Sequence, residues 1–110
     1  MGTRCLTVFE NKEGKEIVVL YRQMDGYPSG HGEELSDFLM NIKLVNGLPI
    51  NPQEKLANGM GCLAAQVVAH FKKEVGRFYL YPAGTRDVWE DYIYFVRERD
   101  GQVEVECKSV

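Results

Sequence analysis

Residues 91–108 read DYIYFVRERDGQVEVECK, and this stretch decides the fold. Asp100-Gly101 is the strongest short signal for a tight turn in the chain, and segments rich in β-branched and aromatic residues flank it on both sides. We therefore expect a β-hairpin made of residues 91–99 and 102–108. A two-residue loop fixes the register of such a hairpin, so that Arg99 faces Gln102 and successive pairs lie on alternate faces.

This register sorts the hairpin into a core face and an exposed face. The pairs expected on the core face are Val96–Val105 and Tyr94–Cys107. The pairs expected on the other face are Arg97–Glu104 and Phe95–Glu106. We expect Arg97 and Glu104 to form a solvated cross-strand ion pair that contributes at most about 1 kcal/mol.

Three further segments have the character of strands. Residues 4–10 and 16–23 are rich in β-forming residues and enclose the polar, glycine-containing segment 11–15, a pattern typical of a hairpin. Residues 17–21 are apolar on both faces, which indicates a strand inside the sheet rather than at its edge. Residues 77–81 read as one more strand, followed by a turn over residues 82–85.

Two segments in the middle of the chain have the period of a helix. Apolar residues recur at i, i+3, i+4 and i+7 after Gly32, at Leu35, Phe38, Leu39 and Ile42. This helix is expected to end near Val45, because Asn46-Gly47 follows. After a polar connector over residues 46–57, a second helix is expected from residue 60 to residue 75, with Gly76 at its end.

The predicted order of elements is therefore ββααβββ in a single domain over residues 1–110. We expect an α+β fold of two layers, with one mainly antiparallel sheet of about five strands and both helices packed on one of its faces.

Composition narrows the classes of function. The chain has 110 residues, a net charge of −3 and 45% apolar residues, as expected of a globular domain and not of a disordered chain. Scattered basic residues in an acidic chain argue against nucleic-acid binding, and no apolar stretch is long enough to span a membrane. Three widely spaced cysteines fit reduced thiols in the cytoplasm better than a disulfide framework.

The segment between the first hairpin and the first helix is unusual. Residues 25–32 read DGYPSGHG and contain three glycines and one proline, which is typical of a tightly specified turn. Gly30 and Gly32 are expected either to adopt positive φ angles or to permit close approach of another backbone. The carboxylate of Asp25 is expected to cap the turn.

Together with an Arg4-Cys5 strand, the pattern Tyr21-x-x-x-Asp25-Gly26-Tyr27-Pro28-x-Gly30-x-Gly32 resembles a group of small uncharacterised phage and prokaryotic proteins. The resemblance covers about residues 3–40. It implies a shared fold and transfers no activity and no catalytic residue.

Two interpretations of this turn stay open. It could bind a ligand, with the backbone amides of Gly30, His31 and Gly32 offered to an anion at the start of a helix. In that case the residues of the site would be Asp25, Tyr27, Gly30, His31, Gly32 and Arg4. Alternatively, the turn only positions Tyr27 against the sheet and leads into the helix, where Glu33 and Glu34 would repel an anion.

Other chemistries have weaker support in the sequence. No zinc-ligand spacing occurs, so we expect no metal site and no cofactor. Cys62 and His70 lie eight residues apart on one helix face, about 12 Å, which is too far for a nucleophile pair. We expect Cys62 to be a small buried thiol. An exposed Trp89 would be a candidate anchor for a protein partner.

These observations favour a small non-enzymatic binding domain of phage or mobile-element type, acting on a protein partner or on a second copy of itself. Residues 25–32 and the aromatic region 79–94 would form its contact surfaces. The alternative is a small enzyme or ligand-binding domain in which Asp25 and His31 converge on a cavity, with Arg4 or Cys5 nearby.

Overall fold

The computed structural model describes residues 2–47 and 55–110. Five strands form the main sheet: β1 (Cys5–Glu10), β2 (Glu16–Arg22), β5 (Phe78–Pro82), β6 (Tyr92–Arg99) and β7 (Gln102–Ser109). A π-helical turn, η1 (Pro28–Gly32), leads directly into helix α1 (Glu33–Leu39). Two short strands, β3 (Lys43–Val45) and β4 (Leu56–Asn58), pair in parallel before helix α2 (Gly59–Phe71).

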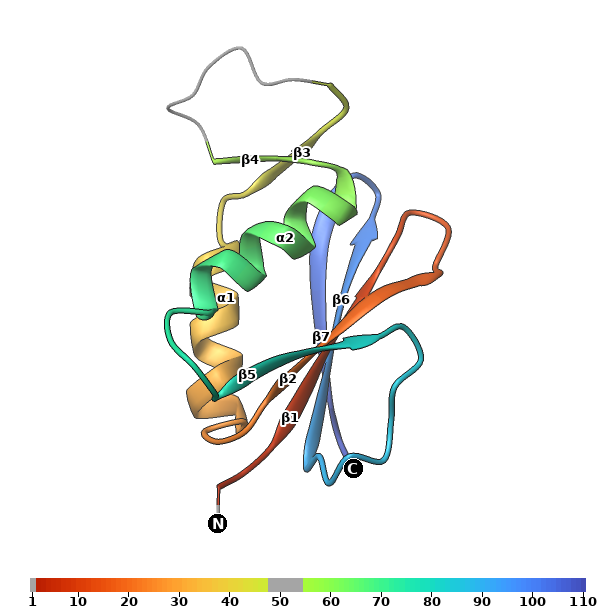
Figure 1. Ribbon diagram of the computed structural model, residues 1–110. Coiled ribbons are helices and arrows are strands. Elements are labelled where there is room, and N and C mark those ends of the chain that lie inside the picture. Colours follow the sequence, from red (N-terminus) through yellow and green to blue (C-terminus); the bar gives the residue numbers. More distant parts are fainter. Residues whose placement is uncertain (1, 48–54) are drawn as a thin grey trace.

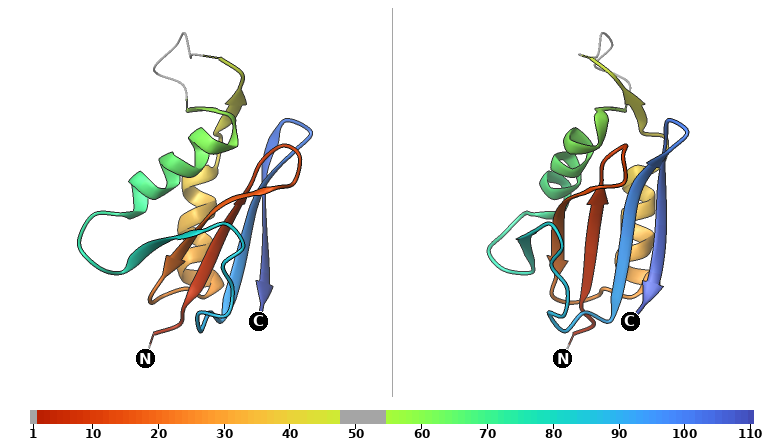
Figure 2. Two further views of the ribbon diagram at one scale, coloured as in Figure 1. Left: turned by 45° about the vertical axis from the view of Figure 1, so that its right-hand side comes forward. Right: turned by 90° about the vertical axis from the view of Figure 1, so that its right-hand side faces the viewer.

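The main sheet has the strand order β5-β2-β1-β6-β7, and both helices lie on one of its faces (Figures 1 and 2). The predicted α+β class and the order ββααβββ are confirmed, and β2 is an interior strand as expected. Three of the four strand pairings are antiparallel, but β1 and β6 pair in parallel, so the sheet is mixed. The parallel pair arises because the chain leaves β5 at one edge and crosses the sheet to return beside β1.

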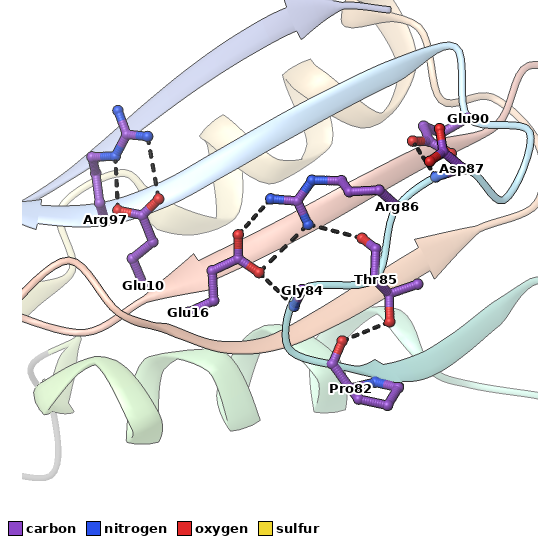
Figure 3. A network of polar contacts seen from close by, with 9 residues as sticks. All are labelled: Glu10, Glu16, Pro82, Gly84, Thr85, Arg86, Asp87, Glu90 and Arg97. Carbon is purple, nitrogen blue, oxygen red and sulfur yellow. Dashed lines mark hydrogen bonds and ion pairs between the residues drawn. The ribbon is translucent and has the colours of Figure 1, made fainter.

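The C-terminal hairpin has the predicted register throughout, including the pairs Val96–Val105 and Tyr94–Cys107. The prediction that Cys107 belongs to the core is wrong, because its side chain is exposed although Tyr94 opposite it is buried. The predicted ion pair between Arg97 and Glu104 is wrong. Arg97 donates to Glu106 at 2.8 Å and to Glu10 of β1 at 3.3 Å (Figure 3), and Glu104 pairs with Arg99 instead. A long side chain reaches its diagonal neighbours as readily as the residue opposite, so register alone does not fix the partner.

Both helices end earlier than their apolar period predicts. The first ends at Leu39 rather than near Val45, and Asn41 with a φ of 67° turns the chain toward β3. Ile42 still packs against the core although it lies outside the helix. At this position the apolar period of the sequence therefore indicates burial and not helical structure. The second ends at Phe71 instead of residue 75.

The predicted polar connector over residues 46–57 is only partly described. Strand β4 occupies its end, and residues 48–54 lie outside the described residues.

The helix-covered face of the sheet carries the larger core. Its buried residues include Phe9, Leu20, Leu35, Leu63, Val67 and Val96. The opposite face carries a smaller cluster of Leu6, Val8 and Val19, against which Val88 from the β5–β6 connection packs. Arg86 of that connection forms an ion pair with Glu16, and the Gly84 amide donates to the same carboxylate at 2.6 Å (Figure 3). The β5–β6 connection is therefore fastened across the second face.

Candidate functional site

The glycines of the 25–32 turn are required for close packing and not for positive φ angles. Asp25 is the residue of this turn that adopts a left-handed conformation, with a φ of 63°. A Cβ atom on Gly26 would lie 2.8 Å from the Cβ of Cys5, and one on Gly30 would lie 2.6 Å from the carbonyl oxygen of Asp25. Of the two roles expected for these glycines, close approach is the one that the structure shows.

Replacing Gly26 by alanine is expected to lower the free energy of unfolding by about 1–3 kcal/mol, because the added methyl group collides with backbone and core atoms of β1. Urea unfolding followed by circular dichroism measures the change. The matched control is Gly61→Ala in α2, where an added Cβ meets no atom within 4 Å. It is expected to stabilise the protein by about 0.5–1 kcal/mol through helix propensity. Equal effects of the two substitutions would contradict the close-approach argument.

The backbone amides of the turn are bonded within the turn itself. The amide of Gly30 donates to the carbonyl of Tyr27 at 2.9 Å, and that of Gly32 points to the same oxygen at 3.5 Å. The amide of His31 donates to the carbonyl of Asp25 at 2.9 Å. These internal hydrogen bonds argue against the hypothesis that the three amides cradle an anion, because the amides already have acceptors.

His31 is completely buried between the 25–32 turn and the sheet. Its Nδ1 is 3.2 Å from Nη1 of Arg22, and its Nε2 is 2.7 Å from the hydroxyl of Thr7. A guanidinium group can only donate, so Nδ1 is the acceptor and Nε2 carries the proton that Thr7 accepts. Burial, and then the positive charge of Arg22, lowers the pKa of His31 to about 3. The imidazole is therefore neutral at physiological pH.

Arg22, at the end of β2, joins the turn to α1 from inside the protein. Only 6% of the residue is exposed. Its Nε donates to the carbonyl of Met24 at 2.7 Å, and its Nη1 donates to the carboxylate of Glu34 at 2.7 Å. Its guanidinium also lies over the ring of Phe78, 5.1 Å from the centroid.

We call Thr7, Arg22, His31 and Glu34 the interior polar cluster, in which Glu34 is the half-exposed outer member. Nothing in the spacing of these residues along the sequence indicates that they meet. The hydroxyl of Tyr94 adds a further bond to the turn by donating to the carbonyl of Gly26 at 2.7 Å. These contacts tie the 25–32 turn to β1, β2, β6 and α1.

The other residues proposed around the turn do not converge with His31. The carboxylate of Asp25 is about half exposed and accepts a hydrogen bond from the hydroxyl of Tyr27 at 3.3 Å. It does not cap the backbone as predicted, since its carbonyl takes that role. The amide of Arg4 donates to the side-chain carboxylate of Asp91 at 3.1 Å, and the amide of Asp91 donates to the carbonyl of Arg4 at 2.8 Å. Burial raises the pKa of the Cys5 thiol to about 12, which keeps it protonated and unreactive at neutral pH.

Trp89 is 81% exposed and stands on the β5–β6 connection. Its φ is 70° and that of Asp87 is 59°, both in the left-handed region. The buried carboxylate of Glu90 accepts a hydrogen bond from the amide of Asp87 at 3.1 Å (Figure 3). It also accepts one from the amide of Val88 at 2.8 Å, and the two bonds hold this tight bend in place. An exposed tryptophan therefore projects from a firmly bonded loop.

The 25–32 turn and the Trp89 loop lie at the same end of the sheet, close to the N-terminal segment (Figure 1). The amide of Gly26 donates to the carbonyl of Thr3, and the amide of Asp91 donates to that of Arg4. Residues 3 and 4 thus lie between the two loops. We call this the end surface and define it by its exposed large side chains, which are Met24, Tyr27 and Trp89.

The remaining sequence candidates are dispersed. Cys62 is exposed, contrary to the prediction, and its Sγ donates to the side chain of Gln66 at 3.3 Å. His70 stacks on Phe38 at 4.2 Å. The aromatic residues of region 79–94 do not form one platform, because Tyr79 and Tyr81 lie with Tyr21 whereas Tyr92 and Tyr94 pack on the helix side.

Within residues 2–47 and 55–110, no helix is long and apolar enough to cross a membrane. The same residues contain no group of three metal-ligating side chains placed around a common point. Comparison with protein-family models, with curated proteins and with solved structures gives no match, so inferences on function rest on this chain's own residues.

Proposed function

We propose that this chain is a small, non-enzymatic binding domain that holds a protein partner on its end surface, with Trp89 and Tyr27 as the anchors. The observation that carries this proposal is the backbone of Trp89. A bulky residue in a left-handed conformation costs the fold about 1–3 kcal/mol, and glycine would adopt it freely. Because the indole is exposed, its packing compensates little of that cost, so the stability of the fold does not explain a tryptophan at this position.

Tyr27 supports the proposal because it is held in a fixed orientation although it is 39% exposed. A Cβ on Gly30 would lie 2.9 Å from its ring, so the glycine makes room for the ring to lie against the turn. Its hydroxyl reaches the carboxylate of Asp25. Tryptophan and tyrosine dominate the energetics of protein interfaces, and side chains ordered in advance lose less entropy on binding.

The chemistry of the turn also favours binding over catalysis. His31 and Arg22 make their hydrogen bonds within the interior polar cluster, and the thiol of Cys5 is buried and protonated. A small enzyme built on the 25–32 turn would need these groups to face a substrate.

We infer a cytoplasmic location and an origin of phage or mobile-element type. The first rests on three free cysteines, two of them exposed, which suit a reducing compartment. The second rests on the Arg4-Cys5 and 25–32 motif. Detection of the chain in a periplasmic or secreted fraction would contradict the first.

Trp89→Gly is expected to weaken binding of the partner about 30-fold or more while raising the free energy of unfolding by about 1 kcal/mol. A photo-crosslinking residue at position 89 first identifies the partner. Titration of the purified partner then measures the dissociation constants. Trp89 is the chain's single tryptophan, so a blue shift of its fluorescence on binding reports its burial directly.

The matched control is Tyr79→Ala on β5, which removes a half-exposed aromatic residue away from the end surface and is expected to leave binding unchanged. Sedimentation of the chain alone tests self-association. A dimer that depends on Trp89 would mean that the partner is a second copy of this chain and not a foreign protein. Unchanged affinity of Trp89→Gly, or crosslinks that concentrate at position 79, would overturn the proposal.

A further inference from the structure

An open pocket of about 540 Å³ lies between α1, the C-terminal end of α2 and the start of β5, and none of its lining residues belongs to the end surface. Its ionisable lining is unusual for this chain. Arg22, Lys55 and Arg77 supply three positive charges against two carboxylates, those of Glu34 and Asp37. The lining side chains alone sum to +1, whereas the whole chain carries −3. Two further carboxylates, those of Asp25 and Glu74, pair with Arg22 and Arg77 from outside the lining. Cations from three separate segments thus line one pocket in an acidic chain.

Arg22 gives this pocket a rigid inner cation. Its hydrogen bonds to Met24, His31 and Glu34 fix the guanidinium in one orientation. Those bonds use Nε and Nη1. Among the described residues, Nη2 makes no hydrogen bond and its nearest acidic contact is a carboxylate oxygen of Asp25 at 4.0 Å. The N–H groups of Nη2 are therefore the guanidinium donors left for a ligand, in competition with the carboxylate of Asp25.

Arg77 is held at the pocket by a backbone that glycine would suit better. Its φ is 67° and follows that of Gly76 at 81°. The carbonyl of Arg77 accepts the amide of Gln23 at 2.8 Å, which fixes this conformation beside β2. Its side chain is about half exposed, and its ion pair with Glu74 at 3.4 Å contributes little at such a surface. The guanidinium is therefore available to a ligand.

Aromatic and acidic groups complete the lining. Phe38 and His70 form a stacked pair with ring centroids 4.2 Å apart, and Phe71 adds a further ring. Such rings favour a flat ligand body. Glu34 is already neutralised by Arg22 at 2.7 Å, and Asp37 remains to accept hydrogen bonds from hydroxyl or amino groups.

We propose that this pocket binds a small phosphate monoester that carries a flat, hydroxylated or aminated ring, as a nucleoside monophosphate does. Cations from three separate segments suit a phosphate dianion, which accepts hydrogen bonds in several directions, better than a single planar carboxylate. This site is distinct from the proposed protein-binding surface, and either one can hold if the other fails.

The test is a titration of the isotope-labelled full chain followed by amide chemical shifts, with adenosine 5′-monophosphate as the probe. Three further probes test the parts of this ligand. Adenosine lacks the phosphate and inorganic phosphate lacks the ring, whereas 4-aminobenzoate has a ring with a carboxylate in place of the phosphate. The monophosphate is expected to bind with a dissociation constant of about 1 mM or tighter and to shift amides of residues 34–38 and 70–78. Each other probe is expected to bind at least about tenfold more weakly.

Arg77→Ala and Lys55→Ala are each expected to weaken binding of the monophosphate about tenfold. Lys73→Ala is the matched control, because it removes one positive charge from a nearby residue that does not line the pocket. Unfolding curves establish that all three variants fold. Adenosine binding as tightly as the monophosphate, shifts confined to other regions, or equal affinities for Arg77→Ala and Lys73→Ala would each overturn the proposal.

Discussion

Replacing His31 by alanine is expected to lower the free energy of unfolding by about 3–5 kcal/mol. The imidazole is fully buried and packs against the rings of Phe71 and Tyr94, with centroids 5.1 and 5.0 Å away. Its removal leaves a cavity there. It also leaves the Thr7 hydroxyl and one N–H of Arg22 without their partner in a region that water does not reach. The cavity and the unsatisfied polar groups both destabilise the folded state.

Urea unfolding followed by far-ultraviolet circular dichroism measures this change. His70→Ala is the matched control, since that imidazole is exposed and contacts the rings of Phe38 and Phe71 from the surface, and a loss below about 1 kcal/mol is expected. The free energy of unfolding of a domain of this size is about 5–15 kcal/mol in total, so His31→Ala removes a large part of it. His31→Gln retains a donor and an acceptor and is expected to recover part of the loss. Equal stability of His31→Ala and His70→Ala would refute the structural role of His31.

The C-terminal hairpin shows how much of the fold could be predicted from the sequence. The Asp100-Gly101 turn sets the register locally, and the alternation of apolar and polar residues assigns the faces. Both pieces of information lie within a few residues of each other. The same holds for β1 and β2, where the polar 11–15 segment separates two apolar runs.

The helix ends and the parallel β1–β6 pair were harder to predict, because they depend on distant partners. Leu44 packs against the core from strand β3, so its apolar character is compatible with either a helix or a strand. The β1–β6 pairing joins segments that are far apart in the chain, with Cys5 beside Tyr92. No local turn signal reports such a contact.

Only the part of the candidate site that depends on neighbouring residues in the sequence could be predicted. The composition of residues 25–32 indicates a special turn, and the exposure of Trp89 agrees with its polar neighbours. The interior polar cluster could not be foreseen, since it depends on three segments meeting. Thr7 in a run of apolar residues was its one visible sign. Arg22 is a charged residue at the end of an apolar strand, and only tertiary packing places it inside.

Lowering the pH from 7 to 5 is expected to reduce the free energy of unfolding by about 2 kcal/mol through His31 alone. The pKa of this residue is about 3 in the folded protein and 6.5 in its ordinary, solvated state. Below pH 6.5 the unfolded chain takes up a proton that the folded chain refuses, because burial and the charge of Arg22 oppose it. The contribution of His31 is therefore fully present above pH 6.5 and falls by about 1.4 kcal/mol per pH unit as the pH approaches 3.

The interval from pH 7 to pH 5 separates this effect from that of the carboxylates. Hydrogen bonds from Arg86 lower the pKa of Glu16, and hydrogen bonds from Arg97 lower that of Glu106, both from 4.5. Their contributions are thus present above pH 4.5 and are lost only at lower pH. Urea unfolding at pH 7, 6 and 5 is expected to show a steep loss for the wild type and for His70→Gln, but a much smaller loss for His31→Gln. If His31→Gln keeps the wild-type slope, the proton uptake belongs to another group, and the neutral, buried state of His31 is refuted along with its place between Thr7 and Arg22.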